Sequence, residues 1–210
     1  MTLDQITTYV RDAQLPGWFD DDEGAALYHA ALRASRSDTP HIIELGTYCG
    51  RSTCYLAAAA HQAGRGQVWT IDRHSPNRPA GWSSQPLVSD PLSVATAALS
   101  GAGLLSKVRL VVAEASEAVS ELPPQAGLVF IDGYHEYRHI LSDLELLGGF
   151  VALGGCLALH DWDQPGPPDR PWGVAQAYYD WLLSGSNDFE EGVAPDQRGT
   201  AHLKLIWRTR

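Results

Sequence analysis

The chain has 210 residues, 44% of them apolar, which is enough for one domain with a sizeable hydrophobic core. The formal net charge is −10 and the 15 basic residues are mostly scattered arginines, which argues against a nucleic-acid partner. No apolar run approaches the roughly 18 residues of a membrane span, and the N-terminus lacks a secretory signal, so we expect a cytoplasmic protein without membrane contact. The three cysteines, Cys49, Cys54 and Cys156, lack metal-ligand spacing and indicate reduced thiols rather than a zinc site or disulfides.

Short aliphatic or β-branched runs alternate along the chain with longer segments of helical period, a pattern typical of an α/β fold built on a parallel sheet. We expect one domain over residues 1–210, in which residues 1–40 form an N-terminal helical cap and residues 41–210 form the core. Within the cap, residues 22–36 place several alanines and a leucine on one helical face, which predicts that this face packs inward.

The core is predicted to begin with a strand over residues 41–46, followed by a tight turn and an alanine-rich helix over 52–63 that stops at Gly64. Further along, Gly154 and Gly155 are expected to turn the chain into the fifth strand. The other predicted strands are 67–72, 107–113, 126–132 and 156–161. The other predicted helices are 135–147 and 174–183. Residues 188–193 and 201–209 are expected to form a closing pair of strands around the polar loop 195–199.

Acidic residues stand at the ends of several predicted strands. Asp72, Asp132 and Asp161 each end a strand, and Glu44 lies near the end of the first one. Because the carboxyl ends of parallel strands meet at one edge of an open sheet, where such folds bind ligands, we expect these acids to converge on one cleft.

The turn after the first strand restricts what the cleft can bind. Gly46 and Gly50 are separated by three residues, which matches neither the dinucleotide fingerprint nor a phosphate-binding loop, so a pyrophosphate is not the expected ligand. Carboxylates repel phosphates but accept hydrogen bonds from ammonium groups and ribose hydroxyls and attract a sulfonium. S-adenosylmethionine carries all three of these groups.

Four segments of the chain resemble the motifs of the class I S-adenosylmethionine-dependent methyltransferases: "IELGTYCGRST", "VWTIDRH", "LVFIDGYHEYRHILSDLELL" and "LGGCLALHDW". The resemblance runs from about residue 22 to the end of the chain. Within that superfamily, Asp-Gly-x-His-x-Tyr followed by Gly-Gly and His-Asp is similar to a small bacterial branch with macrocin-type O-methyltransferases and cephalosporin-hydroxylase-like proteins. The resemblance implies a Rossmann-like, three-layer α/β sandwich around a seven-stranded, mostly parallel sheet whose final strand is reversed.

The resemblance also implies where the cofactor binds. Gly46 and Gly50 would let the backbone approach its methionine part, with Ser52 near the carboxylate and Glu44 facing the ammonium directly or through water. Asp72 would accept hydrogen bonds from the two ribose hydroxyls. The full set of implied cofactor contacts is Glu44, Gly46, Thr47, Tyr48, Gly50, Ser52, Asp72, Arg73, Ala115, Ser116 and Asp132.

Each of these motifs also has an interpretation without a ligand. The turn after the first strand could simply join a strand tightly to a helix, and Asp72 could cap a turn at the end of its strand. Ser116 could cap a short helix instead of contacting adenine, because Glu114 stands where relatives carry a small residue.

The resemblance implies a second set of residues, Asp132, His160 and Asp161, which in sugar-methylating relatives would hold a divalent ion such as Mg²⁺ or Mn²⁺. His160 replaces an acid in that set, and an imidazole suits Mn, Fe or Zn better than Mg. This departure slightly favours a metal-independent enzyme, in which Asp132 touches the methionine end of the cofactor and the His160–Asp161 pair forms a catalytic or hydrogen-bonded wall.

His135 is the candidate general base, with His160 and Asp161 as the other catalytic candidates. It follows Asp132 by three residues, and an unperturbed histidine pKa near 6.5 allows it to take a proton near neutral pH. Its alternative role is that of a helix-terminal histidine bonded to backbone.

The expected activity is therefore methylation of a hydroxyl on a small molecule such as a sugar, a polyketide or another secondary metabolite, and a homo-oligomer is left open. N-methylation, a non-catalytic module that binds S-adenosylmethionine, and a nicotinamide-binding domain are the alternatives. Three tryptophans in irregular segments, Trp82, Trp162 and Trp172, predict a lid over a flat or apolar acceptor.

Overall fold

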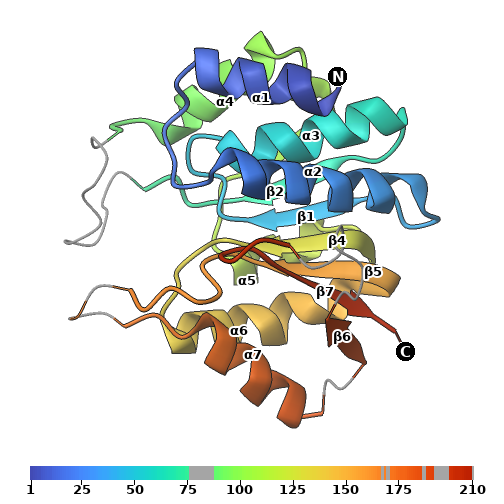
Figure 1. Cartoon of the computed structure of the whole chain (residues 1–210), viewed down its shortest axis with the longest axis vertical. Helices are drawn as coiled ribbons and strands as arrows, with labels where there is room; N and C mark the ends of the chain where they lie inside the picture. The colour runs from blue at the N-terminus through green and yellow to red at the C-terminus, as the bar shows by residue number, and fades with distance from the viewer. Residues whose placement is uncertain (76–87, 167, 169–170, 186–187, 192–198, 210) are drawn as a thin grey trace.

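The protein is described here by a computed structural model that covers residues 1–75, 88–166, 168, 171–185, 188–191 and 199–209. Seven strands form one sheet in the order β3-β2-β1-β4-β5-β7-β6 (Figure 1). The first five strands are parallel, and β7 runs antiparallel to both β5 and β6. This confirms the predicted seven-stranded, mostly parallel sheet with a reversed final strand. The strands are β1 Ile42–Leu45, β2 Val68–Ile71, β3 Val108–Val111, β4 Ala126–Ile131, β5 Val151–Leu159, β6 Phe189–Glu191 and β7 Lys204–Arg208.

Helices cover both faces of the sheet, which completes the predicted three-layer arrangement. In Figure 1, α1 to α4 lie on one side of the sheet and α6 and α7 lie on the other. Successive strand residues alternate between the two faces, so that Ile42 packs with the first group of helices and Ile43 with the second. The helices are α1 Leu3–Asp12, α2 Asp21–Arg36, α3 Arg51–Ala63, α4 Pro91–Gly101, α5 Ala115–Ala118, α6 Tyr137–Leu147 and α7 Val174–Leu183.

The N-terminal helices form part of one helical layer. Residues of α1 and α2 share one buried cluster with residues of α3 and β4, including Ile6, Leu27, Leu56 and Phe130. Among the described residues, no helix combines the length and the apolar character that crossing a membrane requires.

One prediction along the chain was wrong in detail, and one helix was missed. Strand β5 begins at Val151, and Gly154 and Gly155 lie inside it, because Gly154 adopts a left-handed φ of 74° and the pairing with β4 shifts register there. Helix α4 was not predicted. Its start is visible in retrospect, since the side chain of Asp90 accepts a hydrogen bond from the backbone of Ser93 and Pro91 opens the first turn.

The sheet brings the carboxyl ends of its central strands to one edge. The N–H groups of Gly46, Asp132 and His160 donate to the last carbonyls of neighbouring strands, at 2.9, 2.8 and 3.2 Å. The residues that follow β1, β4 and β5 therefore start from the same edge, as the parallel topology predicts.

Candidate active site

A cavity of about 1010 Å³ opens at this edge of the sheet. This volume lies at the upper end of the roughly 300–1,000 Å³ range of ligand pockets, as expected for a site that holds a cofactor and a small acceptor. Two of the predicted site residues, Glu44 and Gly50, are not among the described residues that line the cavity. The predicted site residues that do line the cavity are Gly46, Thr47, Tyr48, Ser52, Asp72, Arg73, Ala115, Ser116, Asp132, His135, His160 and Asp161.

The turn from β1 to α3 is shaped by glycine. Gly46 has φ 102°, and a Cβ there would lie 2.0 Å from the carbonyl oxygen of Asp132. Gly50 adopts φ 80° as the N-cap of α3. The close approach of the end of β4 therefore requires glycine at position 46, whatever the cavity holds. Between the glycines, Tyr48 has φ 44°, an unusual backbone conformation at the cavity wall.

Glu44 lies buried beside the turn and all its bonds go to hydroxyl groups. Its Oε1 accepts from Ser52 at 2.6 Å, and its Oε2 accepts from Thr53 and Thr70, each at 2.6 Å. Burial raises the pKa of Glu44 to about 7, although the three hydroxyl bonds oppose this shift. The carboxyl group has no exposed surface, and Ser52, which bonds to it, lines the cavity.

Asp72 is braced at the end of β2. Its Oδ2 accepts the N–H of Tyr48 at 2.8 Å, and its Oδ1 accepts the N–H of His74 at 2.6 Å. Each carboxylate oxygen has a second lone pair for a ligand, so the role in turn capping and the role in ligand binding are compatible.

The residues that follow β3 form another part of the cavity wall. An ion pair of 2.6 Å joins Arg73 to Glu114. The helix cap of α5 is Glu114, which exchanges hydrogen bonds with Glu117, so the alternative that Ser116 caps this helix was wrong. Ala115 and Ser116 both line the cavity.

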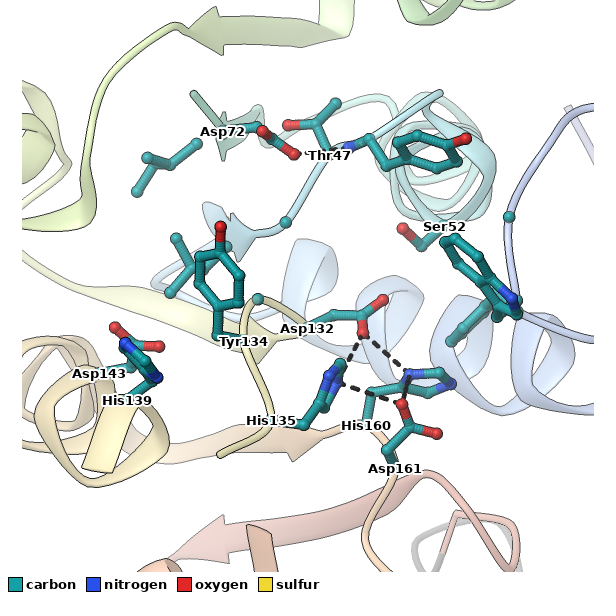
Figure 2. Close-up of a pocket in the computed structure, with 18 of the residues that line it drawn as sticks. Thr47, Ser52, Asp72, Asp132, Tyr134, His135, His139, Asp143, His160 and Asp161 are labelled. Carbon is teal, nitrogen blue, oxygen red and sulfur yellow. Dashed lines mark hydrogen bonds and ion pairs between the residues drawn. The ribbon is translucent and has the colours of Figure 1, made fainter. Parts of the chain in front are cut away.

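Two histidines and two aspartates gather at the ends of β4 and β5, and we call them the His-Asp cluster: Asp132, His135, His160 and Asp161 (Figure 2). His160 Nδ1 lies 2.9 Å from Asp132 Oδ1 and 3.5 Å from Asp161 Oδ2. His135 Nε2 lies 3.4 Å from Asp132 Oδ1 and 3.2 Å from Asp161 Oδ2. Both imidazoles are buried, and Asp161 has φ 53°.

Opposite charges inside the His-Asp cluster shift the pKa values of its members. Burial opposes ionisation of Asp132, but His160 and His135 outweigh it and lower the pKa of Asp132 to about 2. Burial alone would lower the pKa of His160, yet the carboxylates around it hold that pKa well above 6.5. Burial raises the pKa of Asp161, against the effect of the two imidazoles. The cluster is therefore built to stabilise positive charge beside Asp132.

Three residues at this site were missed by sequence reasoning. Glu23, in the first turn of α2, lies 3.1 Å from His160 Nε2. Trp18 stacks on Tyr48 with ring centroids 5.6 Å apart. Asp143 of α6 lines the cavity, and its pKa is raised to about 7, mainly by burial. The Asp-x-x-Glu spacing of a capping box marks Glu23 in the sequence, but nothing there places α2 against the end of β5.

The predicted tryptophan lid is divided by the structure. Trp172 lines the cavity and packs against His135, with ring centroids 4.8 Å apart and the rings tilted by 36°. Trp162 instead packs against Tyr178 of α7 at 5.4 Å and joins the hydrophobic core. Trp82 lies outside the described residues.

Comparisons with known proteins agree with this architecture. TomG, an O-methyltransferase from Streptomyces achromogenes solved in complex with SAM, is 20% identical, with 99% of this chain and 89% of that chain covered and a TM-score of 0.64. An O-methyltransferase from Bacillus cereus, solved in complex with SAH, is 15% identical, with 99% and 90% covered and a TM-score of 0.64. The O-methyltransferase NovP is 15% identical, with 99% and 78% covered and a TM-score of 0.63.

These solved structures share the fold of the chain. A family model described as a methyltransferase domain matches residues 43–162, which include the turn after β1 and all four members of the His-Asp cluster. The match spans more than half of the sequence, so the chain belongs to this family of methyltransferase domains.

Proposed function

We propose that the protein transfers the methyl group of S-adenosylmethionine to a hydroxyl group of a small molecule. The observation that carries the proposal is one continuous cavity that joins the turn after β1, with its bordering Asp72, to the His-Asp cluster. The first part suits a cofactor with an ammonium group and ribose hydroxyls, and the second suits a polar acceptor. Relatives of the same fold solved with SAM and SAH support the choice of cofactor.

The cofactor would lie along the ends of β1 and β2. Asp72 would accept hydrogen bonds from the ribose hydroxyls, and the turn from Gly46 to Ser52 would hold the methionine part. Glu44 would act on the ammonium group through Ser52 rather than by contact. The remaining proposed contacts are Thr47, Tyr48, Arg73, Ala115, Ser116 and Asp132, whereas Gly50 does not line the cavity and serves as the N-cap of α3.

Methyl transfer needs alignment and one proton acceptor. The acceptor oxygen attacks the methyl carbon, the carbon–sulfur bond breaks, and the sulfonium becomes a neutral thioether while the hydroxyl proton leaves. Asp161 is placed to receive that proton because it borders the cavity, and burial raises its pKa, which makes its carboxylate a stronger base. His135 Nε2, 3.2 Å from Asp161, is the second proton acceptor in this set.

The His-Asp cluster also fits a divalent metal ion. Asp132, His135 and His160 each offer one ligand atom, and these atoms lie within 4.8 Å of one another. The sequence favoured a metal-independent enzyme because an acid was missing from the expected set, but His135 supplies a further donor. Two imidazoles among the ligands suit Mn, Fe or Zn better than Mg. Such an ion, when bound, lowers the pKa of a substrate hydroxyl and orients its lone pair.

The acceptor would lie between aromatic side chains. Trp18 and Tyr48 stack on each other in the cavity wall, and Trp172, which also lines the cavity, packs against His135. Aromatic faces suit a sugar ring or a planar polyketide-like molecule, so we favour such a small-molecule acceptor. A cytoplasmic location, supported by three free cysteines, belongs to the same proposal.

Incubation with methyl-labelled S-adenosylmethionine and a panel of alcohols, phenols and amines tests the proposal. We expect label in alcohols or phenols, in the form of an ether. Label in amines alone would assign N-methylation. Tight binding of S-adenosylhomocysteine without transfer to any acceptor would favour a non-catalytic binding module, and binding of NAD in its place would refute the proposal.

A further inference from the structure

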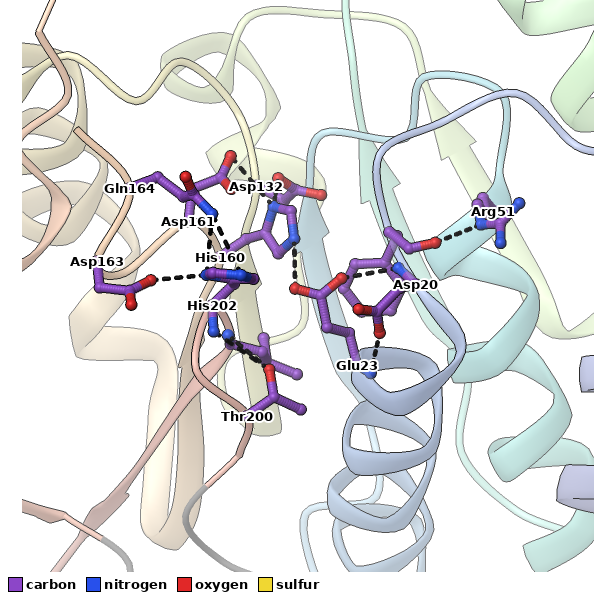
Figure 3. A network of polar contacts seen from close by, with 12 residues as sticks. Asp20, Glu23, Arg51, Asp132, His160, Asp161, Asp163, Gln164, Thr200 and His202 are labelled. Atoms are coloured by element: carbon purple, nitrogen blue, oxygen red, sulfur yellow. Dashed lines mark hydrogen bonds and ion pairs between the residues drawn. The ribbon is translucent and has the colours of Figure 1, made fainter. Parts of the chain in front are cut away.

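Glu23 connects the N-terminal helices to the His-Asp cluster. It lies in the first turn of α2, far from His160 in the sequence, and its Oε1 is 3.1 Å from His160 Nε2. Both side chains are almost completely buried, at 3% and 4% exposure. Figure 3 shows the glutamate between the start of α2 and the imidazole ring.

The second oxygen of the same carboxyl group is also occupied. Glu23 Oε2 accepts the N–H of Asp20 at 2.7 Å, and Asp20 Oδ1 accepts the N–H of Glu23 at 2.8 Å, which completes a capping box. Glu23 therefore has one oxygen fixed by the backbone and one directed at His160. Only a side chain that accepts at both ends can serve these two partners together.

The segment before α2 is held against the core. Arg51 donates to the carbonyl oxygens of Phe19 and Leu15, and the ring of Phe19 lies 5.3 Å from that of His160. The ring of Phe130 lies 6.5 Å from the ring of His160 on another side. Because both side chains are almost completely buried, the bond between Glu23 and His160 competes little with solvent.

We infer that Glu23 is a positioning residue for His160: Glu23 Oε1 accepts the Nε2–H of His160 and thereby turns Nδ1 toward Asp132 and Asp161. A histidine whose other ring nitrogen donates to a carboxylate is fixed in both tautomer and orientation. Without Glu23, the ring could rotate away from this orientation. The inference deepens the proposed function, on which it rests for its catalytic consequence.

Through Glu23, helix α2 contributes to the chemistry of the site. The matched part of the chain begins at residue 43, whereas Glu23 precedes it. The orientation of His160 therefore depends on a helix that lies before that matched segment.

Two substitutions separate the role of Glu23 at His160 from its role as a helix cap. Glu23→Gln keeps the size of the side chain and can still complete a capping box, but its amide has one oxygen for two donors. Asp20→Ala is the matched control, because it removes the side-chain acceptor of the capping box and leaves both oxygens of Glu23 beside their partners. A third variant, His160→Asn, identifies the His160 signals.

The first readout is nitrogen NMR of protein labelled with ¹⁵N-histidine at constant pH. We expect a slowly exchanging proton on His160 Nε2 in the wild-type protein and in Asp20→Ala, and its loss or displacement in Glu23→Gln. The second readout is the affinity for Co²⁺, followed by its visible absorption, which should fall about 10- to 100-fold in Glu23→Gln. Asp20→Ala should retain the wild-type affinity.

A wild-type protein without a proton on His160 Nε2 would overturn the inference. So would a Glu23→Gln variant whose His160 signals and Co²⁺ affinity match those of Asp20→Ala. If the protein binds no Co²⁺ or transfers no methyl group, the nitrogen signals alone decide the role of Glu23. Failure of the proposed function is thus distinguishable from failure of the inference.

Discussion

The backbone N–H of Tyr48 donates a hydrogen bond of 2.8 Å to Asp72 Oδ2, and this bond ties the turn after β1 to the end of β2. The other oxygen of Asp72 accepts from His74 at 2.6 Å. The carboxylate is thus held in one orientation before any ligand arrives. Preorganisation of this kind reduces the entropy lost on binding and makes Asp72 a strong candidate for the ribose contact.

Asp72→Ala should weaken the binding of S-adenosylhomocysteine by about 1.5–3 kcal/mol, because hydrogen bonds to a charged carboxylate are lost. Calorimetric titration measures the change. Glu121→Gln is the control, since Glu121 forms an exposed pair with Arg109 and should leave the dissociation constant unaltered. A wild-type dissociation constant in Asp72→Ala would remove this residue from the binding site.

Glu44 should make the stability of the fold depend on pH. Its pKa of about 7 in the folded protein lies above that of an unfolded glutamate, near 4.3. Between these values the native state holds a proton that the unfolded chain has lost, so the contribution of Glu44 to stability is greatest at low pH and falls as the pH rises to 7. The total loss is about 3 kcal/mol.

Urea unfolding at pH 5 and pH 8 tests this expectation with Glu44→Gln. The variant should lose less stability than the wild-type protein between the two pH values, because the amide does not ionise. Asp143, whose pKa is also raised to about 7, contributes equally to both proteins and cancels in the comparison. Equal losses in the two proteins would show that Glu44 does not titrate in this window.

Gly46 and Gly64 offer a comparison between two left-handed glycines. A Cβ at Gly46, with φ 102°, would lie 2.0 Å from the carbonyl oxygen of Asp132, whereas a Cβ at Gly64, with φ 74°, meets nothing within 4 Å. Gly64→Ala should therefore cost only the conformational strain of about 1–2 kcal/mol. Gly46→Ala should cost more than about 3 kcal/mol, since the end of β4 must also move. Similar midpoints of urea unfolding for the two variants would contradict this explanation of Gly46.

The sheet could be predicted because local sequence encodes it. The run Ile42-Ile43-Glu44-Leu45 is buried on both faces. A parallel strand that is buried in this way appears in the sequence as a short apolar segment that ends in a polar residue. Parallel topology then brings the strand ends together, so Asp72, Asp132 and Asp161 could be placed at one edge without knowledge of side-chain packing.

Contacts between distant segments could not be predicted. Nothing in the spacing of residues shows that Glu23 reaches His160, because that contact depends on how α2 packs across the sheet. The role of Trp162 was misjudged for the same reason, since only the position of α7 shows that this ring packs on Tyr178. The bulge at Gly154 and the buried bonds of Glu44 likewise depend on neighbouring strands and helices.

The His-Asp cluster leads to a prediction about metal dependence. His160 Nδ1 and Asp132 Oδ1 are 2.9 Å apart, and His135 Nε2 lies 3.4 Å from the same oxygen. Ligand atoms that share an ion at about 2.0–2.1 Å lie about 3 Å apart, so these two distances suit ligands of one ion. We expect activity to be lost in EDTA and restored by Mn²⁺.

Metal binding itself should depend on His135. Calorimetric titration with Mn²⁺ should show a loss of affinity in His135→Ala, while His61→Ala, which removes a histidine exposed at the end of α3, should bind Mn²⁺ as the wild-type protein does. Because the ligands must be unprotonated to bind a metal, activity should also fall at low pH and recover when more Mn²⁺ is added. Full activity in EDTA together with loss of activity in His135→Ala would contradict the metal site and assign His135 as a general base, since a base acts without an ion and cannot be rescued by one.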